Sequence, residues 1–339
     1  MLLTGRVLAG VAAVCLTALL GVSDAPNASS ALIAARAGRY SRVAAWSMIW
    51  HLVGGLLAGS AVAHTLLDLI RVTPALFAPS FAAGCFASVV FTGFCTHRGI
   101  PASASVGLVA GLAGAGIAAG GLHAVNWGGL RSFHLVGVIG VLVAIALAPL
   151  LGGFAAALVN WPGHRAALRL PRTSLRSLRT GVWIASGAVA FADGSNDGQK
   201  SMGILAVAVS GSAVVTAHGV SIPWWDKVAC ASLLATATVL GGRRVVVNVA
   251  RGLVRGGPMD ALAGQSASAA VILFAGAIGL PLSTSSVVTS GVVGAGAGRR
   301  RRHVRWRGVL LIFGAWALTV PACAAIGAGL LGLWRAVAG

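Results

Sequence analysis

The fold is decided by a short polar motif inside an apolar run, Gly194-Ser-Asn-Asp-Gly-Gln-Lys200. The run extends from about residue 180 to 213, and it is long enough to cross a hydrocarbon core of about 30 Å. A second polar motif, Gly21-Val-Ser-Asp-Ala-Pro-Asn27, interrupts the apolar run 7–35 in the same way. The aspartates at the centres of the two motifs are 173 positions apart. This spacing indicates an internal duplication.

A second pair of similar stretches supports the duplication. The stretches Ile100-Pro-Ala-Ser-Ala-Ser105 and Leu280-Pro-Leu-Ser-Thr-Ser285 share a proline followed by closely spaced hydroxyl side chains. Their prolines, Pro101 and Pro281, are 180 positions apart, close to the spacing of the first pair. Two motifs that recur in the same order at similar spacing indicate that the chain consists of two related halves.

The composition places both halves in a lipid bilayer. Of the 339 residues, 57% are hydrophobic and only 9% are charged, whereas soluble domains carry about 25% charged residues. The apolar runs predict an all-α polytopic protein of the cell membrane, with about ten membrane segments. These are 7–35, 43–70, 75–96, 99–122 and 132–160, and then 180–213, 224–241, 260–278, 279–298 and 308–333.

An odd number of segments in each half makes the two halves run in opposite directions across the membrane. We predict a first repeat over 1–160, a basic cytoplasmic linker over 161–179 and a second repeat over 180–339. Inverted repeats with helices broken near the middle of the bilayer are characteristic of secondary transporters.

The net charge of +19 comes from arginines grouped between the apolar runs, a pattern typical of membrane loops rather than of nucleic-acid binding. Placing alternate loops on one side collects 19 of the 25 Lys and Arg there and leaves five on the other, with Lys200 inside a span. Since basic loops stay in the cytoplasm, both termini are expected outside. Neither the five Cys nor the eight His show metal-ligand spacing, so we expect no cofactor and no metal site, and the His to be packed or interfacial.

Three of the six acids, Asp24, Asp193 and Asp197, lie in the middle of predicted spans. A charged residue at the bilayer centre costs about 2.5–3.5 kcal/mol on insertion scales, so a role in binding a coupling cation or proton is expected. The alternative is that they lie in solvated loops. Pro26, Gly194 and Gly198 are expected to break the helices and to free backbone groups for an anion and a cation.

Polar side chains around these breaks are the candidates for binding an anionic substrate. Hydroxyls and amides can donate to an oxyanion without the cost of a buried charge, whereas the alternative for each hydroxyl is a bond within its own helix. Lys200 could neutralise the anion or pair with Asp197 one helical turn away. The candidates are Asn27, Ser103, Ser105, Asn196, Gln199, Lys200, Ser283, Thr284 and Ser285.

These motifs resemble the signature sequences of the inorganic phosphate transporter (PiT) family. The matching stretches are Gly21 to Ala28, Ile100 to Gly116, Phe191 to Gly203, Gly242-Arg-Arg and Gly279 to Gly291. The resemblance implies a symporter of inorganic phosphate in which the Asp motifs and the Pro-Ser segments line one site. It also implies that the Pro-Ser segments can be re-entrant hairpins rather than full spans.

The chain departs from the family pattern at four positions. Ser23 replaces the usual Asn, Asp193 replaces a His, and Val106 and Ser286 stand where the Pro-Ser segments usually end in His. From the resemblance, the expected function is phosphate transport by alternating access, coupled to Na⁺, H⁺ or a metal-phosphate complex. Because of these departures, sulfate is the alternative substrate. An intramembrane hydrolase and a membrane sensor are the rival classes. Homo-oligomerisation stays open.

Overall fold

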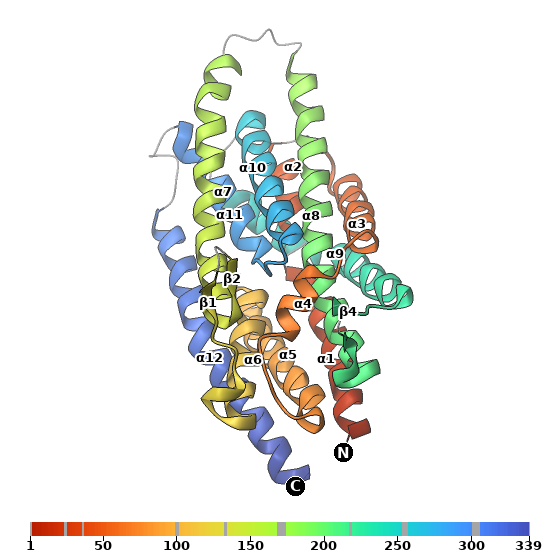
Figure 1. The fold of residues 1–339 in the computed structure, drawn as a ribbon. Helices are drawn as coiled ribbons and strands as arrows, with labels where there is room; N and C mark the ends of the chain where they lie inside the picture. The colour runs from red at the N-terminus through yellow and green to blue at the C-terminus, as the bar shows by residue number, and fades with distance from the viewer. Residues whose placement is uncertain are drawn as a thin grey trace.

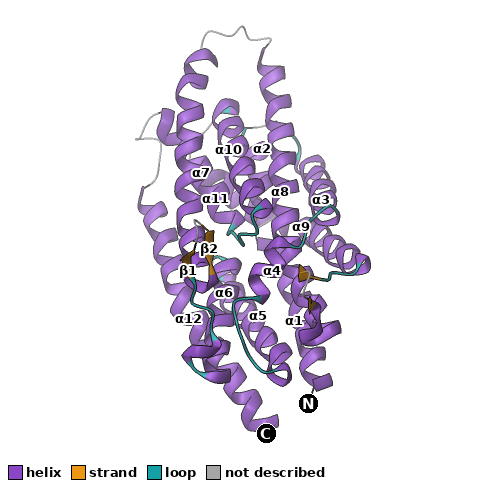
Figure 2. Ribbon diagram, in the orientation of Figure 1, coloured by secondary structure: helices purple, strands orange, loops and turns teal. Residues whose placement is uncertain are grey.

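The computed structural model describes residues 2–23, 26–35, 37–98, 102–131, 134–167, 174–216, 219–252, 257–299 and 306–338. These residues are almost entirely helical (Figure 2). The strands among them form two short antiparallel hairpins, β1 (Gly129–Arg131) with β2 (His134–Val136), and β3 (Val215–Thr216) with β4 (Gly219–Val220). The chain is an all-α membrane protein, as predicted.

The helices follow the predicted segments in both halves. The first half contains α1 (Leu2–Ser23), α2 (Pro26–Ala34), α3 (Tyr40–Leu56), α4 (Ala61–Leu67), α5 (Pro74–His97), α6 (Ala104–Gly120), the short η1 (Leu122–Ala124) and α7 (Gly137–Ala167). The second half contains α8 (Ser174–Ser210), η2 (Gly211–Val214), α9 (Trp224–Gly252), α10 (Pro258–Ala277), α11 (Thr284–Arg299) and α12 (Trp306–Ala338). Among the described residues, five stretches are long and apolar enough to cross a membrane, and α3 with α4 forms a sixth that is bent by 70°.

The packing of the helices shows the internal duplication. In the first half α1 packs against α5, and in the second half the corresponding helix α8 packs against α10. The last helix of each half crosses to the other half, because α7 packs against α10 and α11 while α12 packs against α5 and α6. Figure 1 shows the two sets at opposite ends of the molecule, with α5 and α6 below and α10 and α11 above. Two equivalent sets of helices that lie at opposite ends of the molecule and exchange their last helices are the arrangement expected of an inverted repeat.

The described parts of the Pro-Ser segments, 102–105 and 280–285, lie at the tips of two helical hairpins, and the structure corrects the two spans predicted there. Instead of 99–122 and 279–298, the helices are α6 and α11, with 17 and 16 residues. At 1.5 Å per residue each is about 25 Å long, shorter than the hydrocarbon core. Both begin in the interior of the molecule, where the two tips meet (Figure 1). Each pair, α5 with α6 and α10 with α11, is a hairpin whose first helix is long enough to cross a membrane and whose second helix is shorter, an arrangement compatible with the re-entrant segments that the family resemblance implies.

The break predicted in the second half does not exist. Helix α8 is continuous from Ser174 to Ser210 and passes through Gly194 and Gly198 without interruption. Its glycines serve packing instead, since an added Cβ at Gly194 would clash with the carbonyl oxygen of His51 on α3, and one at Gly54 of α3 would clash with the carbonyl oxygen of Phe191 on α8. In the first half, α1 ends at Ser23 and α2 begins at Pro26, and Asp24 lies outside the described residues.

We expect Gly194→Ala to lower the melting temperature of the detergent-solubilised protein by several degrees. The added methyl group would meet the backbone of α3, which cannot rotate away as a side chain can, and overpacking of this kind typically costs about 1–3 kcal/mol. Gly59→Ala is the matched control, because its Cβ would have nothing within 4 Å. Equal melting temperatures for the two variants would contradict the close α3–α8 packing.

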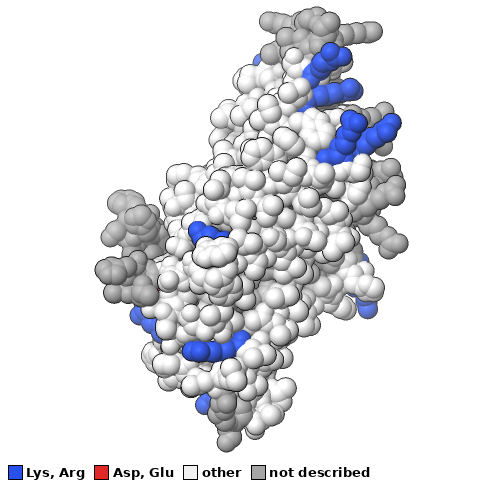
Figure 3. Space-filling model, turned by 90° about the vertical axis from the view of Figure 1, so that its right-hand side faces the viewer, with Lys and Arg blue, Asp and Glu red and all other residues white. Residues whose placement is uncertain are grey.

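The two chain termini lie at one end of the molecule, opposite the ends of α7 and α8 that flank residues 168–173 (Figure 1). Helix α7 continues to Ala167 and α8 begins at Ser174, so the described residues of the predicted linker are helical. On the face shown in Figure 3, one group of Lys and Arg side chains lies toward the upper end and others are scattered over the middle and lower end, and no acidic side chain is visible. The predicted boundaries of the repeats stay a prediction.

The orientation can be checked by labelling single cysteines in intact cells with a membrane-impermeant maleimide. Leu122, near the end that carries the termini, and Leu175, near the opposite end, are 61% and 47% exposed. We expect Leu122→Cys to be labelled from outside and Leu175→Cys only after the membrane is permeabilised, because basic segments stay inside. Four of the five native cysteines are buried, so their background labelling is low. The reverse labelling pattern would reject the orientation.

Candidate functional site

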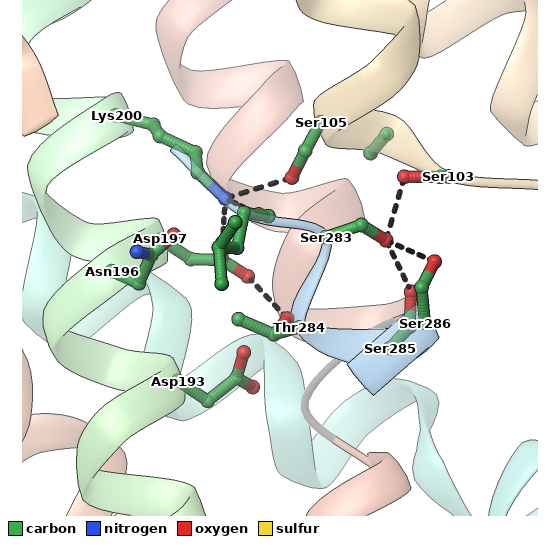
Figure 4. A network of polar contacts seen from close by, with 12 residues as sticks. Ser103, Ser105, Asp193, Asn196, Asp197, Lys200, Ser283, Thr284, Ser285 and Ser286 are labelled. Carbon is green, nitrogen blue, oxygen red and sulfur yellow. Dashed lines mark hydrogen bonds and ion pairs between the residues drawn. The ribbon is translucent and has the colours of Figure 1, made fainter. Parts of the chain in front are cut away.

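Helix α8 presents its polar side chains to the tips of the two hairpins. The Nζ atom of Lys200 donates to Asp197 Oδ1 at 2.5 Å, to the carbonyl oxygen of Leu282 at 2.6 Å and to Ser105 Oγ at 2.7 Å. The side chains of Lys200 and Asp197 are each 1% exposed. One buried ammonium group thus joins α8 to both hairpins (Figure 4).

The hairpin tips contact each other through residues that the repeat makes equivalent. Ser103 Oγ donates to Ser283 Oγ at 2.8 Å, and these residues are 180 positions apart, the spacing between Pro101 and Pro281. Ser283 also contacts the hydroxyls of Ser286 at 2.5 Å and Ser285 at 3.3 Å. Because symmetry-related residues touch only near the axis that relates them, the pseudo-twofold axis passes through this hydroxyl cluster.

Two helix N-termini face this cluster. Ser103 is the N-cap of α6, where its Oγ accepts the N–H of Val106 at 3.3 Å, and Ser283 directly precedes α11. Helix N-termini carry a partial positive charge and unpaired N–H groups, which stabilise anions. Two such ends directed at one buried group of hydroxyls create an environment suited to an oxyanion.

Other predicted site residues lie around this centre. Asn196 donates from Nδ2 to the carbonyl oxygen of Leu280 at 3.2 Å, and its Oδ1 has no partner among the described residues. Thr284 Oγ1 lies 3.5 Å from Asp197 Oδ2. The structure therefore brings together Ser103, Ser105, Asn196, Asp197, Lys200, Ser283, Thr284 and Ser285, with Asp193 one turn further along α8 (Figure 4).

Three predicted site residues are not placed with this group. Gln199 points to α4, where its Oε1 accepts the N–H of Val62 at 2.9 Å. That N–H belongs to the first turn of α4, so Gln199 caps the helix that follows the 70° bend. Asn27 belongs to α2, but its side chain and the whole of Asp24 lie outside the described residues.

Asp193 has a partner that the sequence did not reveal, His51 on α3. His51 Nε2 lies 2.9 Å from Asp193 Oδ2, and both side chains are buried. His51 Nδ1 lies 2.7 Å from the carbonyl oxygen of Ser47, which can only accept, so Nδ1 carries a hydrogen. A second proton then lies between Nε2 and Oδ2, as an imidazolium–carboxylate or an imidazole–carboxylic acid pair. The sequence prediction that this histidine is merely packed missed this pair.

Apart from Ser285, which is half-buried, the group is closed to solvent in this conformation. Ser103, Ser105, Asn196, Asp197, Lys200, Ser283 and Thr284 are each 2% exposed or less. A solute could reach them only after helices move apart. In an inverted repeat, such a movement can open the site alternately to the two sides.

Comparison with known proteins agrees with this geometry. The model of the phosphate transporter family matches the chain twice, at residues 20–175 and 162–327. The chain belongs to the phosphate transporter family. This result confirms the resemblance found in the motifs, and the two matches correspond to the two repeats. With its apolar helices, the membership also confirms a multi-pass protein of the cell membrane.

Relatives within the phosphate transporter family align along nearly the whole chain. A probable low-affinity inorganic phosphate transporter of Mycobacterium bovis is 33% identical, covering 94% of this chain and 75% of the relative. One from Rhizobium meliloti is 29% identical and covers 91% of this chain and 90% of its own length. A solved structure described as the sodium-dependent phosphate transporter has a TM-score of 0.84 and 19% identity, covering 98% of this chain and all of that one. This likeness confirms the fold.

Proposed function

We propose that this protein moves inorganic phosphate across the cell membrane together with a cation or a proton, by alternating access. It would act as a transporter rather than as an enzyme. The family to which the chain belongs and the names of its relatives support phosphate as the substrate. The closed central site inside an inverted repeat supports alternating access.

The observation that carries the proposal is the meeting of the N-terminal ends of two short helices, α6 and α11, at Ser103 and Ser283. Phosphate would bind at this point, with its oxygens accepting from the N-termini of α6 and α11 and from the surrounding hydroxyls. The ligands would be Ser103, Ser105, Ser283, Thr284 and Ser285, with the Nδ2 group of Asn196. Asn27 would complete the site from α2, and Gln199 stays a candidate on sequence grounds, whereas the three N–H donors of Lys200 are already bound by oxygens of the protein.

The acids would serve the coupling ion. Asp24 and its counterpart Asp197 are the proposed coupling groups: Asp24 would hold the transported cation or proton, while Asp197 binds the ammonium group of Lys200, and Asp193 with His51 lies one turn away on α8. A carboxylate facing the anion would repel it in a medium of low dielectric constant. Asp193 is instead paired with an imidazole, which is compatible with a role away from the anion.

The experiment is uptake of radiolabelled phosphate into proteoliposomes that contain the purified full chain. We expect saturable uptake that excess unlabelled phosphate abolishes, with Na⁺ and pH gradients varied separately to identify the coupling ion. Hydroxyl and N–H donors suit any tetrahedral oxyanion, so sulfate is tested as a competitor. Labelled sulfate uptake without phosphate uptake would establish the alternative. Absence of uptake of either anion would contradict transport.

A further inference from the structure

Lys200 is bound as a small cation would be. An ammonium group has three N–H donors, and all three are used by oxygens: a carboxylate of Asp197, a hydroxyl of Ser105 and a backbone carbonyl of Leu282. The Leu282 carbonyl belongs to the non-helical tip between α10 and α11. Unwound backbone carbonyls coordinate Na⁺ in transporters built from inverted repeats, and oxygen atoms in general are the ligands that hard cations prefer.

The position is enclosed and its charge is balanced. Lys200 and Asp197 are each 1% exposed, so together they form a neutral buried pair. The other buried acid nearby, Asp193, has its own partner in His51. Nothing in this arrangement leaves a donor of Lys200 free for an anion, because a contact with phosphate would require one of the three bonds to break.

We propose that the Lys200 ammonium is a tethered cation that fills the position between Asp197, Ser105 and the Leu282 carbonyl, so that transport does not require Na⁺. The positive charge that links α8 to the two hairpin tips is then the Lys200 ammonium group, which is part of the chain and stays in place throughout the transport cycle. The proposal rests on the proposed phosphate transport, and it names Lys200 as a residue that determines which ion is used for coupling.

The first test uses the unmodified protein. Phosphate uptake into proteoliposomes is measured with external NaCl and with choline chloride at the same concentration, pH and membrane potential. We expect equal initial rates in the two media. A stimulation by Na⁺ of about tenfold or more, equivalent to about 1.4 kcal/mol, would overturn the proposal.

The second test removes the tethered cation with Lys200→Ala. Uptake in choline is expected to fall by about a hundredfold, because a buried carboxylate left without its counter-charge is strongly unfavourable. Na⁺ is expected to restore most of it by occupying the space between the same oxygens. The matched control is Lys227→Ala, because Lys227 is the only other lysine and its Nζ contacts a backbone carbonyl, that of Ala58, at 2.8 Å. This control is expected to remain independent of Na⁺.

A second readout does not depend on transport. The melting temperature of detergent-solubilised Lys200→Ala should rise with NaCl but not with choline chloride, since an ion that binds the native state stabilises it. The unmodified protein should show no such difference. If Lys200 were instead an anion ligand, Lys200→Ala would raise the KM for phosphate without gaining a response to Na⁺, and this result would overturn the proposal.

The two proposals fail in distinguishable ways. If the unmodified protein transports no phosphate in either medium, the proposed function is wrong, and the melting temperatures still test the tethered cation. If Lys200→Ala does not assemble in either medium, the proposal is tested by the uptake rates of the unmodified protein in NaCl and in choline chloride. A requirement for Na⁺ in the unmodified protein would leave phosphate transport intact and reject the role of Lys200.

Discussion

Asp197→Asn is expected to reduce phosphate uptake to the level of empty liposomes. The carboxylate is 1% exposed and accepts a hydrogen bond from Lys200 Nζ at 2.5 Å, so the variant leaves a buried ammonium without a counter-charge. Breaking a buried ion pair from one side typically costs about 3–5 kcal/mol, equivalent to a factor of a hundred or more. The measurement is the initial rate of labelled phosphate uptake per amount of folded protein, determined by size-exclusion chromatography.

A double variant separates loss of assembly from loss of function. Asp197→Asn combined with Lys200→Gln has no buried charge at this position, so it should assemble better than Asp197→Asn alone. It should still not transport phosphate, because neither the acid nor the cation is present. Uptake by Asp197→Asn at the rate of the unmodified protein would show that the pair is not part of the machinery.

The duplication could be predicted from the sequence because it left two pairs of matching motifs at nearly constant spacing. Ser103 and Ser283 are separated in sequence by the repeat spacing, and they touch in the structure because equivalent residues of an inverted repeat can meet at its axis. The motifs also predicted which hydroxyls gather at the centre. Composition did not reveal their arrangement at the tips of hairpins, because an apolar hairpin and an apolar span have the same composition; only the family resemblance indicated that hairpins were an alternative.

The prediction that Gly194 and Gly198 break their helix was wrong. A Gly-Ser-Asn-Asp-Gly sequence inside an apolar run is compatible with a break, because glycine weakens a helix by about 1 kcal/mol relative to alanine. In α8 that cost is offset by packing, since Gly194 and Gly198 allow the backbone of α3 to approach closely. Small residues at helix contacts are common in membranes, and a single sequence does not reveal which helix they contact.

The sequence could not pair His51 with Asp193 because 142 positions separate them. Each is, however, a titratable side chain in an otherwise apolar helix. Since such residues in membrane segments usually pair with one another, the sequence did contain an indication that His51 could partner one of the central acids. The same reasoning did identify Asp197 and Lys200, because they are one helical turn apart on α8.

His51→Leu is expected to destabilise the protein more than the combination of His51→Leu with Asp193→Leu. The single variant leaves a buried carboxylate without its partner, at a typical cost of about 3–5 kcal/mol, and Asp193 Oδ1 already has no partner among the described residues. The double variant removes both polar groups and leaves an apolar contact between α3 and α8. Replacing a buried pair by apolar side chains is often neutral or stabilising. Thermal unfolding in detergent, followed by tryptophan fluorescence, measures the order of the three melting temperatures.

The same pair is expected to influence the pH dependence of transport rather than the choice of anion. Because one proton lies between His51 Nε2 and Asp193 Oδ2, Asp193→Asn removes a group that can take up or release it, while the amide can still donate to a neutral imidazole. Uptake by Asp193→Asn relative to the unmodified protein should therefore change with pH, measured as the ratio of initial rates over a series of buffers. The preference for phosphate over sulfate should stay the same, because the hydroxyl cluster is untouched. A reversed anion preference with an unaltered pH profile would place Asp193 at the anion, and would require phosphate to bind one turn further along α8 than the contact between Ser103 and Ser283 indicates.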